Sequence, residues 1–163
     1  MISHHQQTAA IAAPPERVFE FLDSPERLAG HMGKSSLMMG GGRMNIDLDQ
    51  GRGQTVGSHI KLNGSAFGIP ISLDEAITHR EPPSAKEWQT VGEPSLLVIG
   101  SYTMGFRLTP LSTGSELTIF IDYEMPKKNA WLGTLFGDMY AKWCVRQMLE
   151  SARGQFTRAN GAM

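Results

Sequence analysis

Alternation of apolar and polar residues is the feature that most restricts the fold of this chain. In residues 115–124, apolar residues occupy every second position, at Leu117, Ile119, Ile121 and Tyr123, and the positions between them are polar or charged except at residue 120. A period of two residues is typical of a strand with one face buried and the other in water. Residues 44–48, 60–77, 86–91 and 96–108 carry weaker forms of the pattern. The sequence therefore predicts an antiparallel sheet with one apolar face.

Prolines separate the first predicted strand from a helix. Residues 4–11 predict a short strand, which Pro14 and Pro15 end. The same prolines suit the first turn of a helix, and apolar residues at three- and four-residue spacing extend it to about Asp23. Residues 24–33 favour a second short helix, because a serine can cap it, a proline fits its first position and a glycine ends it.

Two further predictions concern the middle of the sheet. Residues 63–64 and 67–70 are both candidate turns, and we favour the second because it leaves strands of matched length on either side. Residues 96–108 carry apolar side chains of one parity over a long run. We expect one extended or bent strand there, with Gly100 and Gly105 as bend points.

The C-terminal segment from Asn129 is predicted to be helical, but its apolar residues do not form one face. An early stripe comprises Leu132, Leu135, Phe136, Met139 and Trp143, and a late stripe comprises Val145, Met148, Leu149, Ala152 and Phe156. At about 100° per residue, the two stripes differ in direction by more than a quarter turn. Three alternatives stay open: a kink within residues 137–143, a first half covered on several sides, or a first half that meets a ligand, partner or lipid surface.

Composition excludes several classes of protein. The 163 residues predict a single domain, 1–163, and a net charge of -1 provides no field that would attract nucleic acid. With 40% hydrophobic and 19% charged residues, the chain is neither disordered nor an integral membrane protein. Residues 1–13 lack an apolar signal-peptide core, and the one cysteine, Cys144, cannot form an internal disulfide. We therefore expect a cytoplasmic location.

Several segments together resemble a known superfamily. Residues 11–23 read IAAPPERVFEFLD, and similar local patterns follow in residues 56–58, 80–83, 108–118 and 148–150. These segments resemble the START-like SRPBCC superfamily, particularly its polyketide cyclase/dehydrase-like branch. The resemblance implies an α+β helix-grip fold (START/Bet v 1-like), with a curved antiparallel seven-stranded sheet around a long C-terminal helix and two short helices after the first strand. It also implies an apolar cavity between sheet and helix.

The sequence departs from this resemblance at two places. Residues 33–42 are rich in Gly, Ser and Met, and Glu75 occupies a strand position that is usually apolar. Either feature could open or specialise a cavity. Whether residues 33–42 or 127–143 form a lid stays open.

Glu75 is the leading polar candidate. It shares parity with the apolar residues of its strand, so alternation turns its carboxylate toward the apolar face, where it must be paired, hydrogen-bonded or protonated. It would then serve as a ligand anchor or as an acid. The alternative is a structural role, through a bulge or a partner such as an arginine. His79 has the same parity and is a candidate partner, although a strand-end histidine is more often a surface residue.

The residues expected to line the cavity are inward-facing aromatic, aliphatic and polar side chains. They are Leu73, Glu75, Ile77, Trp88, Tyr102, Met104, Phe106, Ile121, Tyr123, Phe136 and Tyr140. Tyrosine hydroxyls in such a set can orient the polar end of a ligand. The alternative for each apolar residue alone is a place in the packed core.

The leading hypothesis is therefore binding of a small hydrophobic molecule, such as a lipid, a polyketide-like compound or an aromatic compound. No His, Cys or Ser lies in a recognisable nucleophile arrangement, and His4 and His5 lack a third metal ligand, so we expect no metal and no cofactor. One alternative is a cyclase or dehydratase that uses Glu75 as acid or base. Another is an interaction module, monomeric or homodimeric, whose apolar residues 131–143 contact a partner or transiently a membrane.

Overall fold

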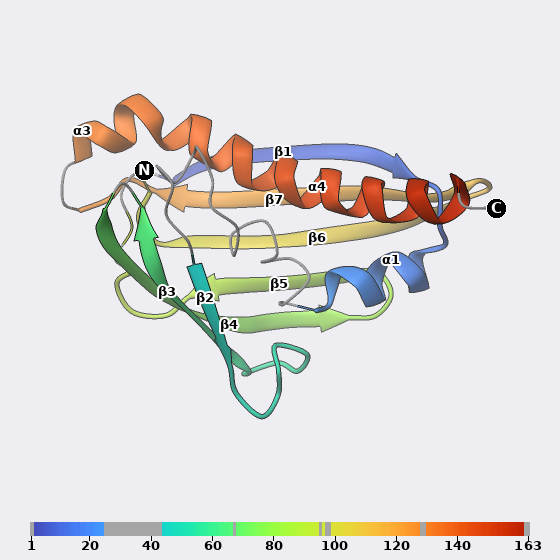
Figure 1. The fold of residues 1–163 in the computed structure, drawn as a ribbon, viewed down its shortest axis with the longest axis horizontal. Helices are drawn as coiled ribbons and strands as arrows, with labels where there is room; N and C mark the ends of the chain where they lie inside the picture. Colours follow the sequence, from blue (N-terminus) through green and yellow to red (C-terminus); the bar gives the residue numbers. More distant parts are fainter. Residues whose placement is uncertain are drawn as a thin grey trace.

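The computed structural model describes residues 2–24, 44–66, 68–94, 96, 99–127 and 130–161. Within these residues, seven antiparallel strands form one sheet in the order β1-β7-β6-β5-β4-β3-β2 (Figure 1). The strands are β1 (Ile2–Ile11), β2 (Met44–Leu48), β3 (His59–Ala66), β4 (Ile69–Glu81), β5 (Ala85–Thr90), β6 (Tyr102–Leu111) and β7 (Gly114–Glu124). The helical elements are α1 (Pro15–Leu22), α3 (Ala130–Leu132), the π-helical turn η3 (Gly133–Gly137) and α4 (Asp138–Gly161).

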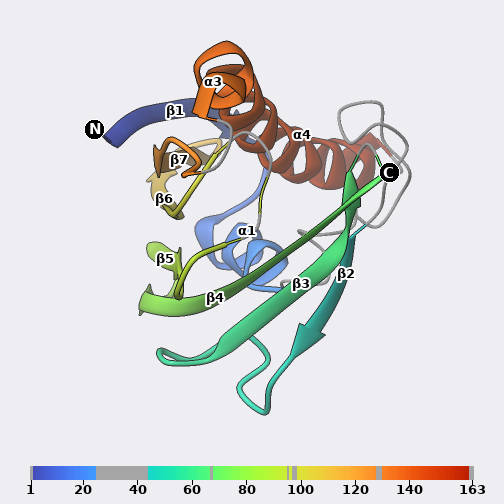
Figure 2. The ribbon, with the colours of Figure 1, turned by 90° about the vertical axis from the view of Figure 1, so that its left-hand side faces the viewer.

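The sheet curves around the helices. Figure 2 shows α1 and α4 on its concave side, with the strands bending around them. Helix α4 packs along β1 and β7, whereas α1 packs against β6, β7 and α4. This is the predicted helix-grip arrangement. The first predicted short helix is confirmed as α1, while the second, at residues 24–33, and the glycine-rich residues 33–42 fall almost entirely outside the described residues.

The end of the concave face beneath α1 is filled by core side chains. Val18, Phe19 and Leu22 of α1 are buried, and the Phe19 ring meets Phe106 of β6 edge to face at 5.5 Å between centroids. The inward residues of β7 are buried as alternation predicts: Leu117, Ile119, Ile121 and Tyr123. Each such aliphatic or aromatic side chain contributes roughly 1.5–3 kcal/mol to folding.

Two predictions about the strands have different outcomes. The turn at residues 67–70 is confirmed, because β3 ends at Ala66 and β4 begins at Ile69. The long strand predicted over residues 96–108 is wrong at residues 99–101, because β6 begins only at Tyr102, while residues 97 and 98 lie outside the described residues. Gly105 lies within β6, where a Cβ would come within 2.5 Å of the Lys86 carbonyl oxygen. Glycine thus permits β5 and β6 to approach closely there.

A π-helical turn interrupts the C-terminal segment within its early apolar stripe. The π-helical turn η3 separates α3 from α4, and its wider turn rotates the following residues relative to the preceding ones. It lies just before the predicted kink at residues 137–143. The early stripe is not covered on several sides, because Leu135 is 63% exposed and Met139 is 50% exposed.

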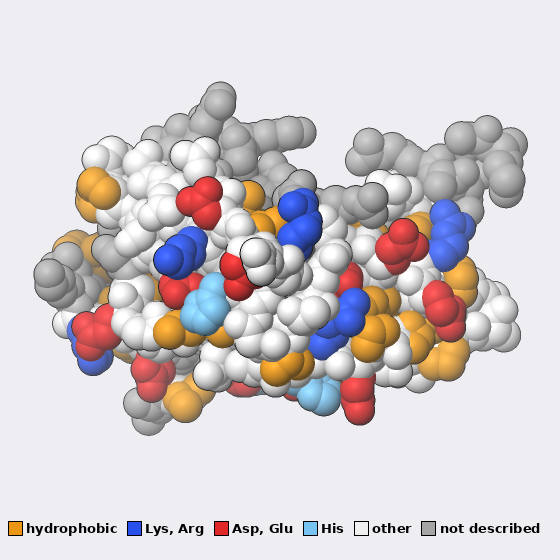
Figure 3. All heavy atoms as spheres, turned by 90° about the horizontal axis from the view of Figure 1, so that it is seen from below, with side chains coloured by type: hydrophobic (Ala, Val, Ile, Leu, Met, Phe, Trp, Pro, Cys, Tyr) orange, Lys and Arg blue, Asp and Glu red, His pale blue; other side chains and the backbone are white. Residues whose placement is uncertain are grey.

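The surface seen in Figure 3 carries interspersed acidic and basic side chains with hydrophobic ones between them. Such mixing fits the near-zero net charge of the chain. None of the described helices has both the length and the hydropathy needed to cross a bilayer.

Candidate functional site

Glu75 lies on the concave, apolar face of β4. Its neighbours of the same parity, Ile71, Leu73 and Ile77, are buried, and Glu75 itself is only 7% exposed. The hydroxyl of Tyr102, at the start of β6, donates a hydrogen bond to Glu75 Oε2. The partner is thus a tyrosine, not the arginine that the structural alternative suggested. Strand alternation places the carboxylate, and the neighbouring β5 and β6 bring the phenol to it.

Burial governs the protonation of this pair. The pKa of Glu75 is raised to about 7, chiefly by burial and to a smaller extent by the nearby Asp74, while the hydrogen bond from Tyr102 and the charge of Lys86 oppose the rise. Burial also holds the pKa of Tyr102 well above its ordinary value, so this phenol remains a donor. Near neutral pH, the Glu75 carboxyl is therefore present in both its acidic and its basic form.

Helix α4 brings two further polar groups toward this pair. Tyr140 and Cys144 lie one turn apart on the helix and are hydrogen-bonded to each other. The Tyr140 ring also packs against Trp143, with 5.7 Å between centroids. Burial raises the pKa of Cys144 to about 12, so the thiol is neutral and unreactive. We did not predict Cys144 here, although its spacing from Tyr140 is the signal that places both on one face.

Three of these side chains lie deep in the protein and yet keep some solvent-accessible surface. Burial is the largest cause of the raised pKa values of Tyr102, Tyr140 and Cys144. Each is nevertheless only partly buried and keeps some accessible surface. The core beneath α1 differs, because Val18, Leu22 and their neighbours there are almost completely covered.

The residues predicted to line the cavity differ in how much of their side chain is exposed to solvent. Leu73, Trp88 and Met104 are buried with a little accessible surface left, while Ile77, Phe106 and Ile121 are completely or almost completely covered. The last three therefore serve the packed core.

Tyr123 and Phe136 also lie away from the Glu75 carboxylate. The hydroxyl of Tyr123 hydrogen-bonds with Ser3 and Asp138, so it is directed to the start of α4. Phe136 of η3 is 41% exposed and lies at the surface.

His79 is not brought together with Glu75. The β4–β5 register shifts between Ile77 and His79, so one extra residue of β4 reverses the alternation. The His79 side chain is consequently half exposed, with Nε2 3.3 Å from a carboxylate oxygen of Glu81. The same shift turns Arg80 toward the end of α1.

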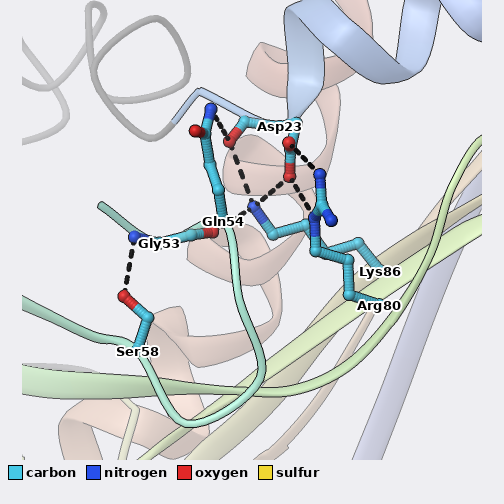
Figure 4. Close-up of polar contacts among 6 residues, drawn as sticks. All are labelled: Asp23, Gly53, Gln54, Ser58, Arg80 and Lys86. Carbon is cyan, nitrogen blue, oxygen red and sulfur yellow. Dashed lines mark hydrogen bonds and ion pairs between the residues drawn. The ribbon is translucent and has the colours of Figure 1, made fainter. Parts of the chain in front are cut away.

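A second polar cluster lies at that end of α1 (Figure 4). Arg80 binds the Asp23 carboxylate with two hydrogen bonds, from Nε at 3.1 Å and Nη2 at 2.7 Å. The ammonium of Lys86 donates to Asp23 Oδ1 at 2.9 Å, to the Asp23 carbonyl at 3.2 Å and to the Gly53 carbonyl at 2.6 Å. All three protons of a charged ammonium thus have acceptors.

The charges of this cluster balance one another. Burial alone would raise the pKa of Asp23, but the hydrogen bonds from Arg80 and Lys86 outweigh it and hold the pKa below its ordinary value. The cluster joins α1, β4, β5 and the β2–β3 loop. We did not predict it, although Lys86 shares parity with the inward Trp88. Because the Asp23 carboxylate is paired with two cations and all three Lys86 protons have acceptors, we interpret it as a structural cluster.

Metal ligands are not grouped in the part of the chain that the structure describes: no three His, Cys, Asp or Glu side chains converge there. His4 instead hydrogen-bonds with Asp122 at 2.5 Å and with Gln6 at 3.1 Å on the exposed face of β1.

Comparisons with known proteins agree with this architecture. The profile of a family described as "Polyketide cyclase / dehydrase and lipid transport" matches residues 4–157. A comparison with curated proteins finds no match. A crystal structure from Chromobacterium violaceum is 20% identical, with a TM-score of 0.63, over 94% of this chain and 97% of that one.

Two other similar structures are enzymes or biosynthetic proteins by name. A norcoclaurine synthase mutant from Thalictrum flavum, in complex with a transition-state analogue, is 13% identical with a TM-score of 0.65, over 98% of this chain and 96% of that one. The di-domain ARO/CYC protein StfQ of the steffimycin pathway is 8% identical with a TM-score of 0.72, over 99% of this chain and 53% of that one. At these identities, the likeness shows the fold alone.

Proposed function

The chain belongs to the polyketide cyclase/dehydrase and lipid transport family, and we propose that it binds a small hydrophobic molecule between the concave face of its sheet and α4. The observation that carries this proposal is the combination of depth and accessibility at Tyr102, Tyr140 and Cys144. Side chains that are desolvated yet partly uncovered are expected around a hollow beneath the surface.

The chemistry around this region suits such a ligand. Leu73, Trp88 and Met104 would contact its apolar body, with about 25 cal/mol gained for each Å2 of apolar surface removed from water. Glu75 and Tyr102 would fix its polar end, because they are the hydrogen-bonded pair on this apolar face.

A matched pair of tryptophan variants tests the location. Leu73→Trp fills the proposed hollow, whereas Ser72→Trp adds the same side chain to the exposed face of the same strand. N-phenyl-1-naphthylamine, a neutral apolar probe that fluoresces in apolar surroundings, should bind the natural protein and Ser72→Trp equally. Leu73→Trp should weaken this binding about tenfold or more, the effect of roughly 1.4 kcal/mol of lost contact. Absence of saturable binding, or equal binding by both variants, would refute the proposal.

A second candidate function is acid or base catalysis on a polycarbonyl substrate by Glu75, as in a cyclase or dehydratase. The pKa of Glu75, about 7, favours it, because a group that titrates near neutral pH can both accept and donate a proton. Glu75→Gln should then abolish turnover of such a substrate and leave its binding largely intact. An unchanged rate would exclude this mechanism.

The exposed apolar side chains around η3 support a third candidate, self-association. Leu135 and Met139 extend from successive turns of the helical segment into solvent, and exposed apolar groups of this size often mark interfaces. Light scattering should show a dimer that Leu135→Ser with Met139→Ser converts to a monomer. A monomeric natural protein would dismiss this candidate.

A further inference from the structure

The Glu75 carboxylate forms no ion pair with any of the residues that the structure describes. Within the described residues, its one hydrogen-bond donor is the neutral hydroxyl of Tyr102, at Oε2. The cation that acts on it from inside the fold is Lys86, whose three protons are already bound by Asp23 and Gly53. A buried carboxylate in this position is only partly compensated.

We propose that the ligand carries a protonated amine at its polar end, which binds the carboxylate of Glu75 while the apolar body lies against the concave face. This inference rests on the proposed binding function and names the class of ligand. An ammonium would supply both the charge and the hydrogen-bond donors that the Glu75 carboxylate lacks. Charge-assisted hydrogen bonds are about twice as strong as neutral ones.

The other groups near Glu75 favour a cation over an anion. Asp74 is acidic, and the tyrosines Tyr102 and Tyr140 and the thiol of Cys144 are neutral, because burial raises their pKa values. A ligand carboxylate would meet Glu75 as a like charge, or would require its protonation. A ligand hydroxyl would bind without compensating the charge. The expected order of affinity is therefore amine, alcohol, carboxylate.

Binding of an amine should also depend on pH in a characteristic way. The ammonium binds the ionised carboxylate, so it competes with the proton on Glu75, whose pKa is about 7. Below that pH, amine affinity should rise by up to about tenfold for each unit by which the pH increases, and binding should release a proton. An alcohol should show no such rise.

Three compounds of one chain length test the proposal on the full chain. Displacement of N-phenyl-1-naphthylamine by n-decylamine, n-decanol and decanoate is measured at about pH 8, where the carboxylate is mostly ionised. Decylamine should bind about tenfold more tightly than decanol, and decanoate most weakly. Glu75→Gln should remove this preference by weakening decylamine about tenfold and leaving decanol unchanged. Glu116→Gln, a change on the exposed face of β7, should preserve the preference.

The possible failures are distinguishable. If the probe and decanol bind but decylamine has no advantage, the ligand class is wrong and the proposed hollow stands. If neither the probe nor any decyl compound binds, the proposed function falls as well. Calorimetry at about pH 6, where Glu75 is mostly protonated before binding, in buffers of different ionisation enthalpy, provides a readout on the natural protein that is independent of any variant. Release of a proton on decylamine binding supports the proposal, and its absence overturns it.

Discussion

Lys86 and Glu75 are two buried charged side chains on neighbouring strands, and their surroundings differ sharply. Lys86 is 2% exposed, and its ammonium has three acceptors and the Asp23 carboxylate beside it. Glu75 is 7% exposed, and its one donor among the described residues is the neutral phenol of Tyr102. A fully paired charge needs nothing more and acts as part of the fold. A partly paired one leaves room for a group that a ligand supplies.

The surroundings of the two groups differ in packing as well. Near Lys86, α1 contributes side chains that are almost completely covered, and Arg80 lies over the ring of Phe19 at 5.4 Å. Near Glu75, the tyrosines Tyr102 and Tyr140 keep accessible surface. Dense packing and full pairing thus occur together at one end of the concave face, and both decrease toward the other.

The largest expected effect is the loss of the Asp23 carboxylate. Asp23→Asn keeps the shape of the side chain but leaves Lys86 and Arg80 without their counter-charge. We expect the free energy of unfolding in urea to fall by about 3–5 kcal/mol at neutral pH. Because the pKa of Asp23 is lowered in the folded state, its contribution is present above the ordinary value of 3.8 and is lost as the pH falls through the folded-state pKa.

Asp122→Asn is the matched control for this prediction. Asp122 also pairs with a basic group, His4, but its side chain is 40% exposed. The change should cost about 0.5 kcal/mol or less. Equal losses of free energy of unfolding in the two variants would show that the buried cluster contributes no more to stability than a surface pair. The contrast between the fully paired Lys86 and the partly paired Glu75 would then have no energetic basis.

The next largest expected effect is a gain in the free energy of unfolding, caused by a change at Glu75. Burial raises the pKa of Glu75 from 4.5 to about 7, so its contribution to stability is complete below pH 4.5 and is lost as the pH rises to about 7. Glu75→Gln keeps an acceptor for Tyr102 and carries no charge. It should be more stable than the natural protein by up to about 3 kcal/mol at about pH 8, and equally stable at about pH 4. Urea unfolding at both pH values checks this, and a constant difference would disprove it.

Local periodicity was enough to predict much of the fold and the placement of Glu75 on the apolar face of the sheet. The alternation in β4 and β7 and the prolines before α1 are signals carried by adjacent residues, and the structure agrees with them. Glu75 was predicted on the concave face by the same rule. Its partner Tyr102 was only one of several inward tyrosines, because alternation gives the face of a residue and not its neighbour.

The features that sequence reasoning missed depend on irregularity or on distant contacts. The bulge after Ile77 reverses the alternation, so His79 lies outside and Arg80 turns inward. The π-helical turn η3 is a second irregularity, and Phe136 lies in it at the surface. Lys86 and Asp23 are 63 residues apart, and no local pattern reveals that each is the reason for the burial of the other.

A smaller loss is expected at the edge of the buried cluster. Arg80→Met keeps an apolar stem over Phe19 but removes both hydrogen bonds to Asp23, which retains Lys86. We expect a loss of about 2 kcal/mol in urea unfolding. Arg107→Met is the control, because Arg107 lies over Phe120 on the outer face at 4.9 Å, and it should cost about 1 kcal/mol or less. If Arg107→Met loses as much free energy of unfolding as Arg80→Met, the two hydrogen bonds from Arg80 to Asp23 add nothing to stability.

The smallest effect on stability tests the pairing of Glu75 most directly. The hydrogen bond from Tyr102 lowers the pKa of Glu75, so Tyr102→Phe should move that pKa above about 7. The free energy of unfolding should change by about 1 kcal/mol or less at about pH 5, where the carboxyl is protonated. The carboxyl carbon-13 shift of Glu75, followed by NMR against pH, measures the change.

Tyr123→Phe is the control, because the Tyr123 hydroxyl hydrogen-bonds with Ser3 and Asp138 and not with Glu75. It should leave the titration of Glu75 unchanged. Equal titration in both variants would mean that Tyr102 does not stabilise the carboxylate. Glu75 would then lack even its one donor, and a ligand would have to compensate the whole charge. An upward shift confined to Tyr102→Phe would assign to the phenol the part of the compensation that the protein supplies, and leave the remainder to a cation from outside.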